Sequence, residues 1–156
     1  MKPLFAVLAT LALSSSFVAA EDKKADAHKH AEAPVDAKPQ PAPEGASVYI
    51  ISPRANKPVK SPVLVRFGLK GMGVAPAGVN IPNTGHHHLI IDGAKVDMTL
   101  PLPMSDQVRH FGGGQTEAEI ELTPGEHTLQ LVVGDFLHIP HNPPIASKVV
   151  KITVEE

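Results

Sequence analysis

The sequence contains no cysteine, no tryptophan and only one tyrosine among its 156 residues. Without cysteine the chain forms no disulfide and carries no lipid on a cysteine side chain. Aromatic residues make up only 4% of the chain, so its core must consist mostly of valine, leucine and isoleucine, which favour strands. The formal net charge of −2 gives no electrostatic reason to expect nucleic acid or an anionic membrane surface as a partner.

The sequence also has no apolar run long enough to span a membrane. Lys2 gives a positive start, residues 4–13 are apolar, and Val18-Ala19-Ala20 is a small-residue exit, which together predict a secretory signal peptide over residues 1–20. The apolar run is well under the roughly 20 residues that a spanning helix needs. We therefore expect a periplasmic or secreted protein with no transmembrane segment after signal removal.

Residues 21–46 differ from the rest of the chain in composition. They are rich in lysine, alanine, acidic residues and proline, and they carry almost no large apolar side chain. Such a segment buries too little surface to offset the entropy lost on ordering, so we predict a disordered linker. His28-Lys29-His30 lies within it and is expected to be solvated, with at most transient capture of metal.

From Ser47 onward, apolar and polar residues alternate with a period of two, and glycine and proline mark frequent turns. This pattern predicts an all-β domain over residues 47–156, an immunoglobulin-like β-sandwich of about seven strands. The clearest predicted strands cover residues 47–52, 63–70, 86–92, 116–122, 127–135 and 147–154.

Nine histidines are present, and three of them, His86, His87 and His88, are consecutive at the start of a predicted strand. We expect residues 116–122 and 127–135 to form a hairpin, and residues 86–92 to pair antiparallel with residues 127–135. This arrangement places six histidines at one end of the sandwich and His127 at the opposite end, roughly 25 Å away. The six are His86, His87, His88, His110, His138 and His141.

Strand alternation divides the triplet, because His86 and His88 share one face and His87 lies on the other. An i, i+2 pair on one strand can hold one metal ion, with histidines from loops completing the coordination shell. The sequence therefore predicts a copper or zinc site formed by these histidines, used in metal carriage, buffering or tolerance. Met72 and Met104, both in predicted loops, are candidate soft ligands for Cu(I).

Several blocks of the sequence resemble one known family. The resemblance extends over about residues 49 to 154, and the family is the small secreted bacterial one catalogued as domain of unknown function 4399. It implies an exported β-sandwich domain without an established activity. The blocks are Gly71-Met72-Gly73-Val74-Ala75-Pro76-Ala77-Gly78, Asn83-Thr84-Gly85-His86-His87-His88-Leu89-Ile90-Ile91-Asp92, His110-Phe111-Gly112-Gly113-Gly114-Gln115-Thr116-Glu117, Pro124-Gly125-Glu126-His127-Thr128-Leu129-Gln130-Leu131 and His138-Ile139-Pro140-His141.

Two other classes of function remain open. In the first, the long loops 71–85 and 136–144 grip a protein or another envelope component, as antibody loops grip an antigen. In the second, the chain is an enzyme such as a sandwich resembling copper/zinc superoxide dismutase. That family's paired cysteines and metal-bridging loop are missing here, and no Ser/His/Asp or paired-carboxylate arrangement is evident. We therefore expect a binding protein, with no catalytic residues.

Overall fold

The computed structural model describes residues 37–156, so the predicted signal peptide and most of the predicted linker lie outside the described residues. The described part contains nine strands and no helix. None of its elements is a helix that could cross a membrane. The strands are β1 (Ser47–Ser52), β2 (Pro58–Lys60), β3 (Val63–Lys70), β4 (Gly73–Val74), β5 (Thr84–Ile91), β6 (Val108–His110), β7 (Glu117–Ile120), β8 (Gly125–Gly134) and β9 (Val150–Glu155).

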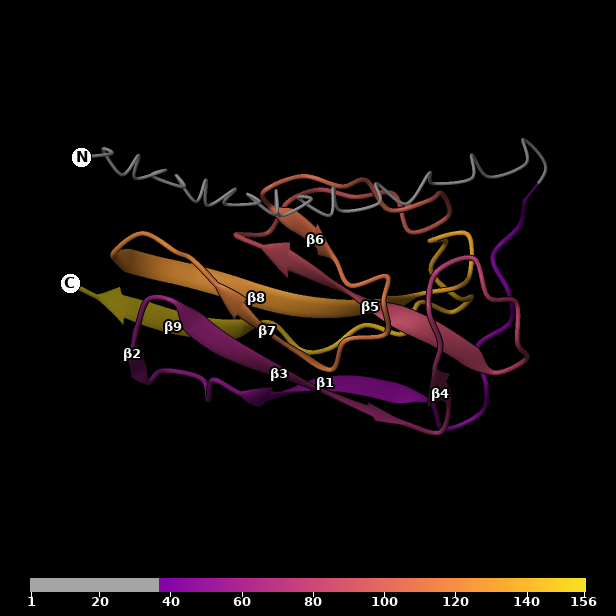
Figure 1. The fold of residues 1–156 in the computed structure, drawn as a ribbon, viewed down its shortest axis with the longest axis horizontal. Coiled ribbons are helices and arrows are strands. Elements are labelled where there is room, and N and C mark those ends of the chain that lie inside the picture. Colours follow the sequence, from indigo (N-terminus) through magenta and orange to yellow (C-terminus); the bar gives the residue numbers. More distant parts are fainter. Residues whose placement is uncertain (1–36) are drawn as a thin grey trace, which may run out of the picture. The chain divides into compact units, whose positions relative to one another are not determined.

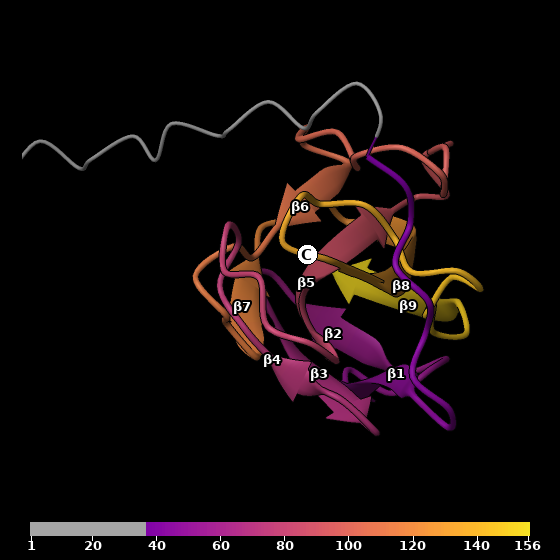
Figure 2. The same ribbon diagram turned by 90° about the vertical axis from the view of Figure 1, so that its right-hand side faces the viewer.

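The strands form an immunoglobulin-like β-sandwich of two sheets, as the alternation of apolar and polar residues predicted (Figures 1 and 2). The smaller sheet has the order β1-β3-β7, and the larger has the order β2-β9-β8-β5-β4, with β6 also paired to β5. Strand β5 therefore has β8 along one edge and the short strands β4 and β6 along the other. The number of strands exceeds the predicted seven because β2, β4 and β6 are each only two or three residues long.

The main core lies between the two sheets and is almost entirely aliphatic. Val63, Val65 and Phe67 alternate along β3 and face Leu129, Leu131 and Val133 of β8 in one buried cluster. Alternate residues of a strand point to opposite faces, so the exposed residues between them face solvent. Burial of these branched side chains stabilises the fold by about 25 cal/mol per Å² of apolar surface removed from water.

The predicted hairpin between residues 116–122 and 127–135 is wrong. Strand β7 pairs with β3 in the smaller sheet, whereas β8 pairs with β5 and β9 in the larger one. The turn between them carries the chain across the sandwich from one sheet to the other. The predicted antiparallel pairing of β5 with β8 is present, with His86 opposite Gly134.

Strand β5 is buried on both of its faces. His87, Leu89 and Ile91 face the main core, while Ile90 contributes to a second, smaller cluster on the outer face of the larger sheet. The loop between β5 and β6 covers this outer face, and Leu102 from that loop completes the smaller cluster. The segment from His86 to Ile91 thus has no side chain that faces open solvent.

The first described residues also contact the sandwich. Ala42 donates a backbone hydrogen bond to Asn142 at 3.0 Å, and Asn142 donates one to Gln40 at 2.8 Å. Ala42 and Ala46 pack partly buried against the main core. The end of the predicted linker is therefore hydrogen-bonded to the loop that follows β8.

Candidate metal centre

Four histidines meet on the outer face of the larger sheet. His86 and His88 lie two positions apart on β5 and point to the same face, and His110 on β6 stands directly opposite His88 in the strand register. Directly opposed residues of an antiparallel pair have Cβ atoms only about 4.5–5.5 Å apart, so this register brings the two rings together. The fourth member, His138, comes from the loop after β8.

The four side chains each direct one ring nitrogen into a common space. These four nitrogens all lie within 4.8 Å of one another. Nε2 of His86 and Nδ1 of His138 lie 3.1 Å apart. Two nitrogens bound to the same tetrahedral zinc ion would be about 3.3 Å apart, because each Zn–N bond is about 2.0–2.1 Å long. The His86–His138 pair therefore has nearly the separation that a single ion requires, and the other nitrogens lie within 4.8 Å.

The loop that carries His138 is held by Asp135. One carboxylate oxygen of Asp135, Oδ1, accepts hydrogen bonds from the backbone N–H groups of Leu137 at 2.8 Å and Ile139 at 3.0 Å. The Asp135 carbonyl also accepts the N–H of His138 at 2.9 Å. His138 adopts a positive φ of 68°, which is uncommon outside glycine and costs free energy, so these bonds fix a conformation that aims its ring at the group.

Two glycines leave room for the histidine rings. A Cβ atom on Gly134 would lie 2.8 Å from Cε1 of His88, and one on Gly112 would lie 2.2 Å from Cε1 of His110. Any side chain at either position would displace the ring beside it. The backbone at these glycines therefore packs directly beside two of the four rings and limits the space in which they can move.

Burial and mutual repulsion keep the strand histidines neutral. Desolvation, followed by repulsion from His138, His110 and His87, lowers the pKa of His86 to about 3. Desolvation, followed by repulsion from His86 and its neighbours, lowers the pKa of His88 well below its usual value of 6.5. At neutral pH both imidazoles are therefore uncharged, each with one ring nitrogen free of a proton, and neutral imidazole is the form in which histidine binds metal.

The buried strand histidines also have polar atoms without a partner. Both ring nitrogens of His88 and Nδ1 of His86 are buried and have no hydrogen-bond partner among the described residues. A buried polar group left unpaired costs about 1–3 kcal/mol. His87 Nε2 and His141 Nδ1 are in the same condition, so an unpaired nitrogen alone does not mark a ligand. Only the convergence of four rings separates this group from the other histidines.

Two of the six sequence-predicted site residues do not join the group. His87 lies on the opposite face of β5, where its ring packs 5.1 Å from Phe67 and Nδ1 contacts the Gln115 carbonyl at 3.2 Å. His141 is buried elsewhere, because the bridge between Gly134 and Pro140 turns the chain back toward β8 after His138. The structure brings together His86, His88, His110 and His138.

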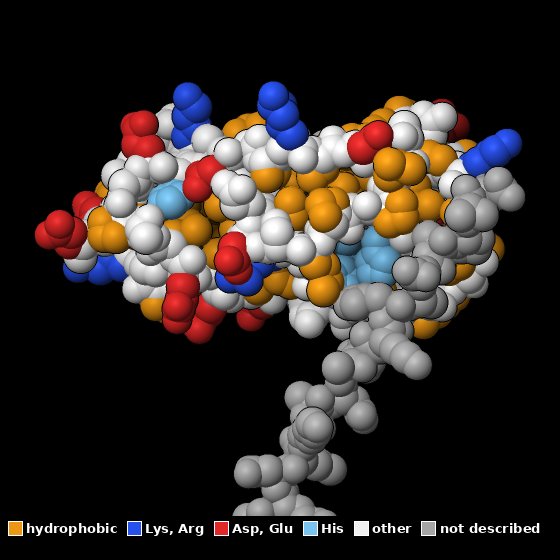
Figure 3. All heavy atoms as spheres, turned by 90° about the horizontal axis from the view of Figure 1, so that it is seen from above, with side chains coloured by type: hydrophobic (Ala, Val, Ile, Leu, Met, Phe, Trp, Pro, Cys, Tyr) orange, Lys and Arg blue, Asp and Glu red, His pale blue; other side chains and the backbone are white. Residues whose placement is uncertain are grey.

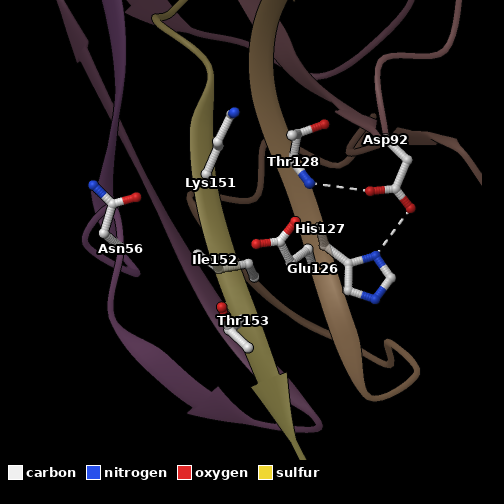
Figure 4. A pocket seen from close by; sticks show the side chains of 8 residues that line it. All are labelled: Asn56, Asp92, Glu126, His127, Thr128, Lys151, Ile152 and Thr153. Atoms are coloured by element: carbon white, nitrogen blue, oxygen red, sulfur yellow. Dashed lines mark hydrogen bonds and ion pairs between the residues drawn. The ribbon is translucent and has the colours of Figure 1, made fainter.

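His127 lies at the other end of β8 from Gly134, as expected, and is not in the group. Its Nδ1 forms an ion pair with Asp92 at 2.9 Å (Figure 4). Its Nε2 bonds to the Thr123 carbonyl at 2.8 Å. Partial burial lowers the pKa of His127, but the bonds to Asp92 and Thr123 outweigh that effect and the pKa is raised. A surface hollow of about 370 Å³ adjoins this pair.

The two loop methionines have different positions. Met72 packs against the main core and is not available as a ligand. Met104 is exposed and lines a surface hollow of about 420 Å³ together with His110. Asp135 and Gly134 were not singled out from the sequence, whereas Gly112 belongs to the glycine-rich block over residues 110–117. An aspartate side chain commonly accepts a hydrogen bond from the backbone N–H two residues later, as Asp135 does from Leu137. An aspartate at the start of a loop is therefore the sequence signal that could have identified Asp135.

One protein family matches the chain. Residues 65–155, more than half of the chain, match the family described as "Domain of unknown function (DUF4399)". No curated protein matches the chain. No solved structure matches it either.

Proposed function

We propose that this chain, which belongs to the DUF4399 family, binds a single copper or zinc ion through His86, His88, His110 and His138. The observation that carries the proposal is the convergence of four ring nitrogens within 4.8 Å of one another, drawn from two strands and a loop. Imidazole suits zinc and copper, and the group contains no carboxylate or thiolate that would favour calcium, magnesium or an iron–sulfur cluster.

The composition of the group supports a binding role over catalysis. Catalytic zinc sites typically use three protein ligands and leave a fourth position open for water or substrate, whereas closed sites use four protein ligands. Four histidines would fill a tetrahedral shell. No sequence motif for hydrolysis or group transfer accompanies them. We therefore assign no catalytic residues.

Access to the group supports reversible exchange of the ion. His86 and His88 are fully buried, but His110 and His138 are only partly so. Figure 3 shows histidine side chains at the surface beside hydrophobic ones. The partial exposure of His110 and His138 makes their side of the group the route by which an ion would enter. Together with the export predicted from residues 1–20, this favours carriage, buffering or tolerance of metal in the periplasm or outside the cell.

A second candidate is an interaction module, which exposed apolar side chains near the group favour. Val79 and Ile81 are exposed on the loop before β5, and Leu100 and Met104 are exposed on the loop before β6. Backbone hydrogen bonds join the first of these loops to Gly112 and Phe136, and the second to His138. The exposed apolar side chains thus lie on loops that are hydrogen-bonded to the segments that carry His110 and His138. Both functions, metal binding and protein interaction, would be present if the partner receives the ion from this chain or delivers the ion to it.

Metal titration by calorimetry tests the proposal. The protein is used without a histidine tag and with His28→Ala and His30→Ala, so that linker histidines do not contribute. We expect one ion per chain, with a dissociation constant well below about 10 µM, which corresponds to roughly 7 kcal/mol of binding free energy.

Two further variants make the titration specific. His86→Ala/His88→Ala should abolish tight binding, whereas His127→Gln, at the far end of the sandwich, should bind as the parent does. Tight binding that survives in the double variant, or parent binding weaker than about 10 µM, would overturn the proposal and leave the interaction module as the better assignment.

A further inference from the structure

Six distances join the centres of the four histidine rings, and together they define the shape of the group. The distances are 4.8 Å for His86–His88, 4.9 Å for His86–His110, 5.0 Å for His86–His138, 5.1 Å for His88–His110, 5.9 Å for His88–His138 and 4.6 Å for His110–His138. Four points that are nearly equidistant from one another lie at the corners of a tetrahedron.

The size of this tetrahedron fits a metal ion at its centre. A Zn–N bond of about 2.1 Å places the centre of an imidazole ring about 3.2 Å from the ion, so tetrahedral rings are about 5.2 Å apart. The observed separations run from 4.6 to 5.9 Å, on both sides of that value. Small movements would therefore bring all four rings to the distance that a tetrahedral ion requires.

A square arrangement does not fit the same distances. Four imidazoles in a square would be about 4.5 Å apart along the edges and about 6.4 Å apart along two diagonals, which join opposite pairs. The longest observed distance joins His88 and His138 at 5.9 Å, so the other diagonal would have to join His86 and His110. Those two rings are only 4.9 Å apart. No choice of diagonals turns the group into a square.

The scaffold resists conversion to a square. His86 and His88 are fixed two residues apart on a strand that is buried on both faces, and His110 is fixed opposite His88 by the β5–β6 register. The backbone at Gly134 and Gly112 lies directly beside the rings of His88 and His110. His86 and His110 would have to separate by about 1.5 Å to open a square, and the backbone at Gly112 leaves little room beside the His110 ring.

We propose that the four histidines form a preformed tetrahedral nitrogen cage that selects Zn(II) and Cu(I) over Cu(II). This inference rests on the metal binding proposed above and adds the geometry and oxidation state of the ion. Cu(II) favours square-planar or tetragonal nitrogen sites, whereas zinc is almost always tetrahedral in closed sites. The group also contains no thioether or thiolate, so geometry and not soft sulfur ligation provides the preference for Cu(I).

Cobalt(II) provides a spectroscopic test of the geometry, because a tetrahedral Co(II) ion absorbs visible light far more strongly than an octahedral one. The full chain with His28→Ala and His30→Ala is titrated with Co(II) and then with Zn(II). We expect intense visible absorption that Zn(II) removes stoichiometrically. Copper is added separately as Cu(II) and, without oxygen, as Cu(I) against a competing chelator.

The expected copper result is a reduction potential above that of the aqueous Cu(II)/Cu(I) couple. At least a tenfold preference for Cu(I) relative to water should raise the potential by about 59 mV or more. His138→Asn is the matched control, since asparagine tolerates the positive φ at this position while it removes one ligand. The variant should show weaker Co(II) absorption and a lower copper potential, with the fold checked by its thermal midpoint.

Failure of the inference is distinguishable from failure of the proposed function. Weak, octahedral-type Co(II) absorption together with a tetragonal Cu(II) resonance spectrum and no rise in potential would overturn the cage while metal binding stood. An absence of binding for Zn(II), Co(II) and both copper ions would overturn both proposals.

Discussion

Nε2 of His86 and Nδ1 of His138 lie 3.1 Å apart although 52 positions separate the two residues in the sequence. One ring donates a hydrogen to the other in the metal-free protein, and both residues belong to the group of four. A bound ion would replace that single hydrogen at almost the same nitrogen separation. Metal binding should therefore require little rearrangement of the strand or the loop.

Metal should stabilise the folded protein. An ion that binds only the folded state adds about 2.7 kcal/mol to the free energy of unfolding when free metal is a hundredfold above its dissociation constant. For a domain of this size that gain corresponds to a rise in thermal midpoint of roughly 10 °C. Differential scanning calorimetry with and without Zn(II) measures it. An equal rise in His86→Ala/His88→Ala would show that the ion acts elsewhere.

Acid should destabilise the metal-free protein. The lowered pKa values of His86 and His88 mean that these side chains take up protons on unfolding at any pH below about 6.5. Their contribution to stability is complete above pH 6.5 and falls as the pH drops toward the folded value, about 3 for His86. Each residue contributes about 1.4 kcal/mol per pH unit in that window. Urea unfolding at pH 7 and pH 5 measures the loss.

A control variant makes the acid prediction specific. His86→Gln removes one of the titrating groups, so its free energy of unfolding should fall less steeply between pH 7 and pH 5 than that of the parent. Equal stability of the parent at the two pH values would contradict the assignment of neutral, buried imidazoles.

The ion pair of His127 and Asp92 should respond to pH in the opposite direction. The raised pKa of His127 means that its contribution is complete below about pH 6.5 and is lost as the pH rises through the folded pKa. Asp92→Asn keeps an acceptor for the Thr128 N–H but removes the charge, and should cost about 1 kcal/mol or less near pH 6. The difference from the parent should shrink by pH 8.5, and nuclear magnetic resonance should show a lower His127 pKa. An unchanged His127 pKa in the variant would refute this account.

Asp135 should control affinity through the position of His138. Asp135→Ala leaves the N–H groups of Leu137 and Ile139 without their acceptor, so it should lower stability by about 1–3 kcal/mol. Metal affinity should fall about tenfold or more, as for other residues that orient ligands from outside the coordination shell. Asp135→Asn retains a suitable oxygen and should preserve most of both properties. Calorimetric affinity that stays at the parent value in Asp135→Ala would show that the loop needs no such support.

Truncation at two positions should separate the linker from the domain. A chain that begins at Lys38 should unfold like the longer protein, because it keeps the hydrogen bonds between residues 40–42 and Asn142. A chain that begins at Ser47 should still fold but lose about 1–2 kcal/mol, since two backbone hydrogen bonds disappear and partly buried alanines are removed. Identical urea midpoints for the two proteins would indicate that this contact adds nothing to stability.

The positions of strands were predictable where core and exposed residues alternate along the strand. Val63, Val65 and Phe67 alternate with exposed residues, and the predicted strand over 63–70 has the bounds of β3. The partners of strands were harder to predict, because a turn such as Pro124-Gly125 has the same sequence whether the chain returns beside its own strand or crosses to the other sheet. In the structure β7 joins the smaller sheet beside β3, where Ile120 packs into the main core.

Part of the candidate site could be predicted from the sequence, again because strands have a regular alternation of faces. Strand alternation separates His86 and His88 from His87, and the antiparallel pairing of β5 with β8 places the loop with His138 at the right end. Loop direction has no such periodicity, so His141 could not be distinguished from His138 although they are three residues apart. The tetrahedral arrangement depends on a strand register and on a positive φ, neither of which composition encodes.

Strand β5 has no solvent-facing side chain between His86 and Ile91 and no long free edge, which has a consequence for mutational tolerance. In a saturation-mutagenesis experiment, these six positions should form one uninterrupted block that accepts few replacements, in contrast to β7, where exposed residues alternate. Intolerance at His86 or His88 would then not by itself distinguish a need for metal from a need to fold. Selection at low and high metal supply would separate the two, since only the ligand positions should change their tolerance with metal.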